Sequence, residues 1–227
     1  MILVPGVLAT LVAIAPGCDV SGATLDWGFK ESFRAYIASD IANGEWTTAD
    51  GATYETPSFS WTDGTGRWDP ATGQGYIDFT GSVRFTGHDG LLDTTIANPT
   101  LLLNGDSGTL LLDVTGATMD GDMIDSLDVS FVDLPELAVA GDDAVRTVDA
   151  ATALSADGEI AFPNYPAGEA FDPVSVTLNV GKTCSTERAD DVADDGNPAL
   201  MGPLAGGIAL ALVAGAGVFF ATRRRRA

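Results

Sequence analysis

The sequence predicts a mainly β fold of antiparallel sheets in a sandwich or barrel-like arrangement, with one or two short helices and a C-terminal transmembrane helix. Glycine and proline are frequent, at 27 and 11 of 227 residues, and such turn-rich chains favour β structure over helical bundles. Apolar residues also alternate with polar ones over short segments. The clearest segment is Gly75 to Thr86, where one face of a strand would carry Ile77, Phe79, Val83 and Phe85.

Further strands are expected along the chain. They lie at Leu91 to Ile96, Thr100 to Leu103, Thr109 to Val114, Leu127 to Val132 and Val174 to Val180. Between the second and third of these, the turn residues Asn104-Gly105-Asp106-Ser107-Gly108 predict a hairpin.

One helix is predicted over Trp27 to Ala38, with Asp26 as its N-cap and Asn43-Gly44 as the end of the element. Its apolar residues recur at helical spacing and form one stripe: Phe29, Phe33, Tyr36 and Ile37. We therefore expect Tyr36 on the inward face of this helix or at the edge of that face.

Both ends of the chain are expected to lie outside the folded domain. Residues 1–17 are uncharged and apolar like a secretory signal, although the usual positive start is missing. Residues 202–222 are apolar and long enough to span a bilayer, and the arginine-rich tail at 223–227 is typical of the cytoplasmic side. The acidic stretch at 185–201 is too poor in apolar residues to fold and is expected to form a stalk.

These segments leave a single domain at 18–184, exported and held at the cell membrane by the C-terminal helix. An apolar segment followed by arginines is also the layout of a sortase signal. No LPxTG motif precedes it in the sequence, so retention in the membrane is favoured.

The two cysteines, Cys18 and Cys184, bracket this domain. In an exported protein such a pair usually forms a disulfide, which here would join the entry and exit of the domain. Lipidation of Cys18 is the alternative, because a small residue precedes this cysteine after an apolar run. The match to a lipidation motif is weak, since Pro16 interrupts it and the usual leucine is absent.

Charge and composition exclude several functions. The formal net charge of −21 repels phosphate backbones and argues against nucleic-acid binding. His88 is the single histidine, so a histidine-based zinc site is excluded. No G-x-S-x-G motif supports a serine nucleophile. The chain is therefore not expected to be an enzyme.

Motifs in three segments of the sequence, at 25–37, 81–93 and 165–173, resemble the HtaA domain family. The first, Leu25 to Ile37, reads LDWGFKESFRAYI; the second, Gly81 to Asp93, reads GSVRFTGHDGLLD; the third contains Tyr165-Pro166-Ala167-Gly168 followed by Asp172-Pro173. The stretch from Leu91 to Val114 continues the similarity. Together these segments cover nearly the whole domain in the family's order.

This resemblance implies a mostly β haem-binding domain of the bacterial cell envelope that takes part in haem uptake for iron. It implies that Tyr36 is the axial ligand of ferric haem, that His88 supports this tyrosine and that Tyr165 contributes to the pocket. The implied partners are haem and other envelope haem-binding or haem-transport proteins. Arg34 and Arg84 are candidates for contacting a propionate of the haem. The alternative function is a membrane-anchored adhesion or glycan-binding domain that keeps the fold without the haem.

Overall fold

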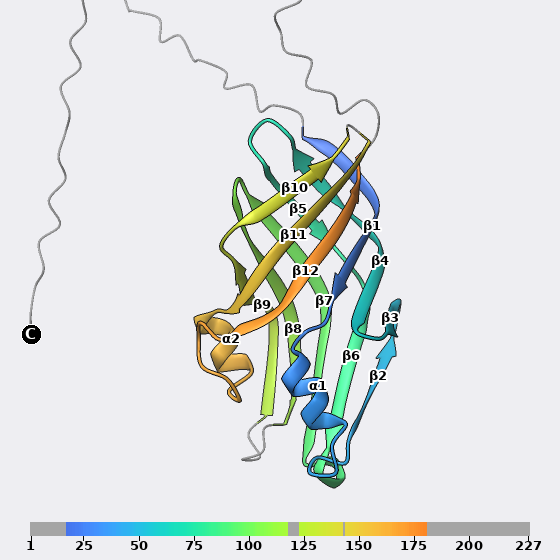
Figure 1. Ribbon diagram of the computed structural model, residues 1–227, viewed down its shortest axis with the longest axis vertical. Coiled ribbons are helices and arrows are strands. Elements are labelled where there is room, and N and C mark those ends of the chain that lie inside the picture. Colours follow the sequence, from blue (N-terminus) through green and yellow to red (C-terminus); the bar gives the residue numbers. More distant parts are fainter. Residues whose placement is uncertain (1–16, 118–122, 143, 181–227) are drawn as a thin grey trace, which may run out of the picture. The chain divides into compact units, whose positions relative to one another are not determined.

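The computed structural model describes residues 17–117, 123–142 and 144–180, which belong to one compact unit spanning Met1–Glu187. These residues are mainly β strand, with two α-helices and one 3-10 turn (Figure 1). In chain order the elements are β1 (Cys18–Trp27), α1 (Glu31–Ile37), β2 (Glu45–Ala49), β3 (Ala52–Glu55), β4 (Ser58–Asp69), β5 (Gln74–Asp78), β6 (Ser82–Gly87), η1 (His88–Gly90), β7 (Leu92–Asn104), β8 (Ser107–Ala117), β9 (Met123–Leu134), β10 (Leu137–Gly141), β11 (Val145–Leu154), α2 (Ala156–Ala161) and β12 (Ala170–Asn179).

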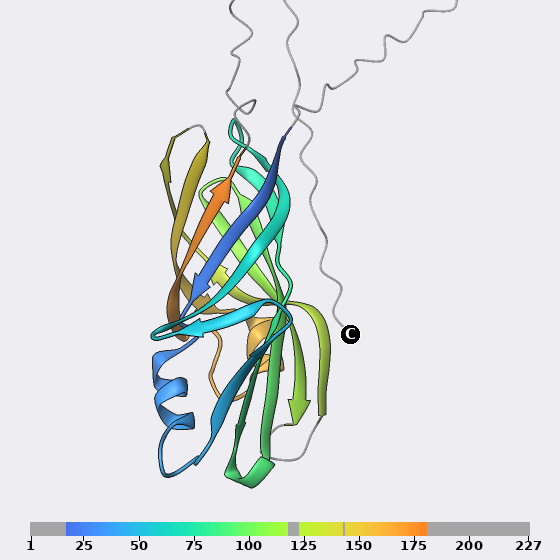
Figure 2. The same cartoon turned by 90° about the vertical axis from the view of Figure 1, so that its right-hand side faces the viewer.

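All strand pairs found among the described residues are antiparallel. The order across the sheet is β2-β6-β7-β5-β4-β1-β12-β11-β9-β8. Strand β8 also pairs with β7, so the sheet curls back on itself (Figures 1 and 2). Alternate side chains of its strands form the buried core. The expectation of a mainly β, antiparallel fold with short helices is therefore confirmed.

The alternating segment from Gly75 to Thr86 forms two strands, β5 and β6, where one was predicted. Both pair with β7: β5 with Thr100–Asn104 and β6 with the part of β7 that begins at Leu92. The break lies at Gly81, whose φ of +134° is open to glycine and strained for other residues. The predicted inward face is nevertheless confirmed, because Ile77, Phe79, Val83 and Phe85 are all buried.

Conversely, two predicted strands form the single strand β7. Its register with β8 shifts between Ala97 and Thr100, at Asn98-Pro99, and Asn98 has a φ of +48°. Such an irregularity bends a strand without ending it. The predicted hairpin between β7 and β8 is confirmed, with Asn104 opposite Ser107.

The predicted start of the first helix is wrong, whereas its last predicted residue, Ala38, is the C-cap of the observed helix. Strand β1 continues to Trp27, which pairs with Phe59 on one side and Val174 on the other. The carboxylate of Asp26 accepts a hydrogen bond from the Ser60 hydroxyl and does not cap a helix. Phe29 then has a φ of +62°, outside the helical region, and α1 begins only at Glu31 and ends at Ile37. The chain near Trp27 therefore continues as a strand, because strand pairing and burial of Trp27 stabilise it more than the helical spacing of the apolar stripe favours a helix.

The second helix, α2, was not singled out from the sequence. Its N-cap is Ser155, whose hydroxyl oxygen accepts a hydrogen bond from the Gly158 amide at 2.9 Å. The same hydroxyl donates to the Ser130 carbonyl and so joins α2 to β9.

We expect Ser155→Ala to lower the free energy of unfolding by about 1 to 2 kcal/mol, because it removes the N-cap and leaves a helix amide without its partner. Urea denaturation followed by circular dichroism measures this change. Ser107→Ala is the matched control, since the Ser107 hydroxyl makes only an exposed turn contact of 3.4 Å. Equal midpoints for the two variants would contradict the capping role.

An aromatic cluster forms the core where α1 meets the sheet. Phe29 is fully buried at its centre, with six aromatic rings at centroid distances between 5.1 and 5.8 Å: Trp27, Phe33, Phe85, Phe131, Phe162 and Phe171. These rings come from both halves of the chain, so the cluster joins α1 and β6 to β9 and to the segment after α2.

Several sequence predictions fall outside the described residues. These are the signal apart from its last residue Gly17, the stalk at 185–201, the transmembrane helix at 202–222, the arginine-rich tail at 223–227, and Cys184. In the part of the chain that the structure describes, no helix has the length and apolar character needed to cross a membrane.

Candidate functional site

The fold brings together Tyr36 and His88, which are 52 positions apart in the sequence. The Tyr36 hydroxyl lies within hydrogen-bonding distance of His88 Nε2, and the two ring centroids are 5.7 Å apart. Tyr36 is in the last turn of α1 and is half-buried, while its neighbours Phe33 and Ile37 are buried. Tyr36 therefore lies at the edge of the inward face, as its place on the helical stripe predicts.

His88 is positioned by the tight turn that joins β6 to β7. Its φ is +52° and that of Asp89 is +55°, so two successive residues adopt the left-handed conformation. The His88 amide donates to the Ala42 carbonyl at 2.7 Å, which ties the turn to the segment after α1. This backbone contact brings the imidazole to the phenol, and such a geometry cannot be read from local sequence.

Tyr165 follows α2 and lies at the same end of the fold as α1. Its ring stacks on Phe162 at a centroid distance of 5.8 Å and meets Phe171 edge-on at 5.8 Å. Phe162 in turn contacts Phe33 of α1 at 5.1 Å. Figures 1 and 2 show α1, α2 and the β6–β7 turn toward the same end of the strands. The structure thus groups all three predicted residues there, although no direct contact joins Tyr165 to Tyr36.

Large apolar side chains are exposed around this end. Ile41 follows α1, Leu91 follows η1, Met123 begins β9 and Ile160 is in α2, and their exposed fractions are 73%, 65%, 76% and 76%. A shallow pocket also opens here, lined by Leu92, Thr94, Ala117, Ile124, Ala161, Phe162, Pro163 and Asn164. Large exposed apolar side chains such as these are available for contact with a ligand or partner.

The nearby arginines are engaged by carboxylates of the domain. Arg34 Nη2 donates to Asp172 Oδ2 at 2.9 Å. Arg84 Nε donates to Asp93 Oδ1 at 2.7 Å, and this hydrogen bond lowers the pKa of the Asp93 carboxyl below its ordinary value. Both guanidinium groups therefore already have carboxylate partners, and their contact with a propionate stays a prediction.

The Tyr36 oxygen and His88 Nε2 are donor atoms that this end offers to a metal. No group of three or more histidine, cysteine, aspartate or glutamate side chains in the described ranges could hold a metal ion. A single phenol oxygen paired with an imidazole suits an iron whose other ligands come from a porphyrin, since phenolate is an established haem ligand.

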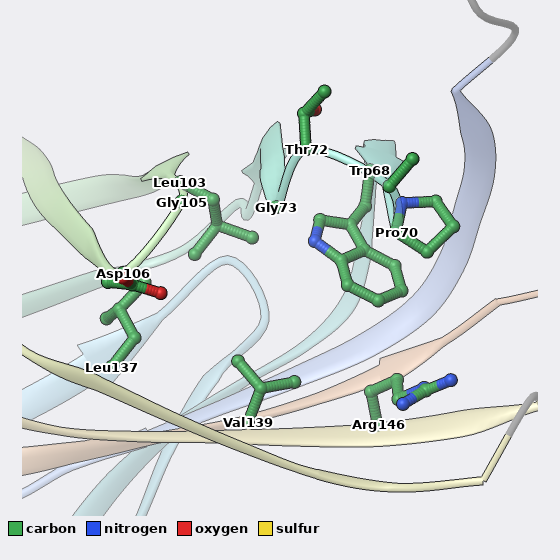
Figure 3. A pocket seen from close by; sticks show the side chains of 11 residues that line it. Trp68, Pro70, Thr72, Gly73, Leu103, Gly105, Asp106, Leu137, Val139 and Arg146 are labelled. Atoms are coloured by element: carbon green, nitrogen blue, oxygen red, sulfur yellow. The ribbon is translucent and has the colours of Figure 1, made fainter.

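A separate cavity of about 510 Å³ lies at the other end of β7, between the β4–β5 and β7–β8 turns and β10. In Figure 3, Trp68 and Pro70 stand on one side of it and Leu103 and Leu137 on the other. None of the predicted site residues lines this cavity.

The fold and site define a mainly β, antiparallel domain whose first helix and β6–β7 turn present a paired tyrosine and histidine beside an apolar surface. The HtaA (Htaa) family model matches residues 22–177 of this chain. The chain therefore belongs to the HtaA family, as its three motifs indicate.

Solved structures agree with this assignment. The C-terminal domain of HtaA from Corynebacterium glutamicum is 35% identical, with a TM-score of 0.68, covering 72% of this chain and 99% of that domain. The N-terminal domain of the same protein is 34% identical, with a TM-score of 0.61, covering 71% and 98%. HtaB of that organism, described as a haem-binding protein, shares the fold at 23% identity and a TM-score of 0.57, covering 73% and 98%. No curated protein matches the sequence.

Sequence reasoning gave no role to two charged residues that the structure places beside the site, Lys30 and Asp172. Both lie in the family motifs, but their partners are 139 and 138 residues away in the chain. The available signal was Lys30, a basic residue directly after Trp27-Gly28-Phe29. A charge buried there needs a partner, which indicates an acidic residue elsewhere in the domain.

Proposed function

We propose that this domain binds ferric haem, with Tyr36 as the axial ligand of the iron, and passes the haem to another protein of the cell envelope. The observation that carries the proposal is the contact between the Tyr36 hydroxyl and His88 Nε2, in a chain of the HtaA family. Tyr165 would contribute to the same pocket from the segment after α2.

The chemistry of the pair supports this assignment. A phenol has an ordinary pKa of about 10, so it needs help to bind iron as phenolate at neutral pH. An imidazole nitrogen at hydrogen-bonding distance from the hydroxyl accepts its proton and then stabilises the anionic oxygen as a donor. Such an outer partner orients a ligand and adjusts its basicity. An anionic oxygen ligand favours iron in the Fe(III) state, and a bound ferric haem would supply iron in that state.

The surroundings of the pair fit a flat apolar ligand. Leu91 and Ile41, on the two segments that flank the pair, are exposed, and Phe162 and Pro163 line the shallow pocket nearby. The pocket is too small to enclose a porphyrin, so these side chains would supply apolar contacts to part of the haem. Because haem carries anionic propionates and the chain is strongly acidic, apolar contact and iron ligation must supply the affinity.

The proposal includes the location of the domain and its disulfide. The domain would lie outside the cell, held to the membrane by residues 202–222, and a bridge between Cys18 and Cys184 would close it. The structure describes no free cysteine, and Cys18 begins β1 beside Trp68 of β4. The protein would thus be an exported receptor held at the membrane, and its activity would be the reversible transfer of haem.

Titration of the purified domain with hemin tests the function. We expect a Soret band with saturable binding at one haem per chain, together with the charge-transfer band of an iron tyrosinate. Absence of any saturable Soret change would refute haem binding and favour the adhesion or glycan-binding alternative.

We expect His88→Ala to weaken hemin binding about 10- to 100-fold, the usual cost of removing the outer partner of a metal ligand. The tyrosinate band should persist, because Tyr36 remains. Gln74→Ala is the matched control: Gln74 is an exposed polar residue at the far end of β5, next to Asn104. If His88→Ala binds hemin as tightly as Gln74→Ala, the imidazole does not support the ligand.

A further inference from the structure

Two buried cations belong to the first helix: Lys30 is its N-cap residue and Arg34 is in its last turn. Lys30 is 7% exposed and Arg34 is 8% exposed. A buried charge is costly unless it is paired and hydrogen-bonded. Both cations find their partners far along the chain, in the segment from Phe162 to Asp172, which we call the strap. The strap leaves α2, carries Tyr165 and leads into β12.

The C-terminal residue of the strap, Asp172, is bound to the first helix and to Phe29, which precedes it. Arg34 pairs with the Asp172 carboxylate at 2.9 Å, and the Glu31 amide donates to the other oxygen of that carboxylate at 2.9 Å. The Asp172 amide donates to the Phe29 carbonyl at 2.9 Å. These contacts hold one end of the strap but none of them touches Tyr165.

Lys30 makes the contacts that reach Tyr165. Its ammonium group donates to Glu169 Oε1 and to the Ala170 carbonyl, each at 2.8 Å. The same nitrogen lies 4.8 Å from the centroid of the Tyr165 ring and 5.2 Å from that of Phe171. An ammonium group has three N–H donors. Two are used on the strap backbone and Glu169, and the charge lies over the aromatic faces.

We propose that Lys30 is a positioning residue that holds the Tyr165 ring in place for the ligand bound at Tyr36. This inference rests on the proposed function. Lys30 lies one residue before α1, so it couples the helix that carries Tyr36 to the strap that carries Tyr165. Loss of its charge frees the Tyr165 ring while leaving Tyr36 and His88 in place.

The test measures hemin dissociation into excess apomyoglobin from the parent domain, Lys30→Met, Tyr165→Ala and the double variant. We expect Lys30→Met to speed dissociation about tenfold, in line with a desolvated cation–π contact, with the tyrosinate band unchanged. The double variant should dissociate no faster than Tyr165→Ala alone, because both changes remove one shared interaction. Lys30→Arg keeps a cation over the ring and should return the rate to within about twofold of the parent.

Arg67→Met is the matched control, because it removes an exposed cation from β4. The Arg67 guanidinium is paired with Asp19 at 3.6 Å, away from the site, and hemin should dissociate from this variant at the parent rate. Should Lys30→Met not fold, Lys30→Gln keeps donors for Glu169 and Ala170 without the charge, and the same acceleration is expected of it. A parent-like rate in the neutral variants, or rate increases that multiply in the double variant, would overturn the role of Lys30. A parent domain without a Soret band would instead overturn haem binding itself.

Discussion

The Tyr36→Phe domain should lose the charge-transfer band of the iron tyrosinate and bind hemin at least about 100-fold more weakly. The substitution removes only the hydroxyl oxygen that faces His88 Nε2. The ring still packs at the edge of the core, so the apolar surface for a porphyrin is retained. A 100-fold loss corresponds to about 2.7 kcal/mol, a modest value for an anionic ligand to a ferric ion.

Hemin titration and the visible spectrum measure this effect, and Tyr76→Phe is the matched control. Tyr76 is 43% exposed on β5 and pairs with Leu102, away from α1. The control should keep the parent spectrum and affinity. A Tyr36→Phe domain that retains the tyrosinate band would show that another tyrosine binds the iron, and Tyr165→Phe would then be examined in the same way.

Asp172→Asn should lower the free energy of unfolding by about 2 to 3 kcal/mol, the usual contribution of a hydrogen bond between charged groups, because the side chains of Arg34 and Asp172 are only 9% and 24% exposed. Arg34 is 8% exposed and its Nη2 is 2.9 Å from the Asp172 carboxylate. The same carboxylate accepts the Glu31 amide at the start of α1. When Asp172 loses its negative charge, the Arg34 guanidinium stays buried without an anion. The amide of Glu31 in the first turn of the helix also loses a charged acceptor.

Urea denaturation at neutral pH measures this loss, with Asp93→Asn as the control. Asp93 also pairs with an arginine, Arg84, at 2.5 Å, but the side chains of this pair are 36% and 55% exposed. Solvent screens such pairs, so little change is expected. Equal losses in the two variants would show that burial of the Arg34 pair does not matter.

The Asp93 pair also has a defined pH dependence. The hydrogen bond from Arg84 lowers the pKa of the Asp93 carboxyl in the folded state. A lowered folded-state pKa means that the pair stabilises the fold above the unfolded pKa of about 4 and that this contribution is lost as the pH falls through the folded value. The small difference in the free energy of unfolding between the Asp93→Asn variant and the parent at neutral pH should therefore shrink further in acid.

Local patterns predicted the faces of strands better than their ends. The alternation between Gly75 and Thr86 identified four buried side chains correctly, because burial follows the two-residue period whether or not the strand is interrupted. The interruption itself depends on β7: the Phe79 amide donates to the Pro99 carbonyl and the Asn98 amide to that of Gly81. Those partners are distant in sequence, and the local signal at the break, Gly81, does not by itself distinguish an interrupted strand from a bulged one.

The first helix shows that a correct burial pattern can still give the wrong type of secondary structure. Its apolar spacing is real, and Phe29, Phe33 and Ile37 are all buried. Yet Trp27 belongs to β1, since its backbone completes a strand between β4 and β12 and its indole donates to the Asp172 carbonyl at 2.7 Å. Spacing alone cannot distinguish a helix from a strand followed by a shorter helix when both bury the same residues.

The sequence by itself determined the fold class, the family and the identity of the residues proposed for the site, because turn chemistry, alternation and motif order are local properties of the chain. Only the tertiary structure decided that Tyr36 meets His88, that Tyr165 lies under Lys30 and that Arg34 is paired with Asp172. Each of these contacts joins segments that are brought together by strand pairing and by burial of the aromatic cluster. Such contacts depend on the packing of the whole domain, and no neighbouring residues encode them.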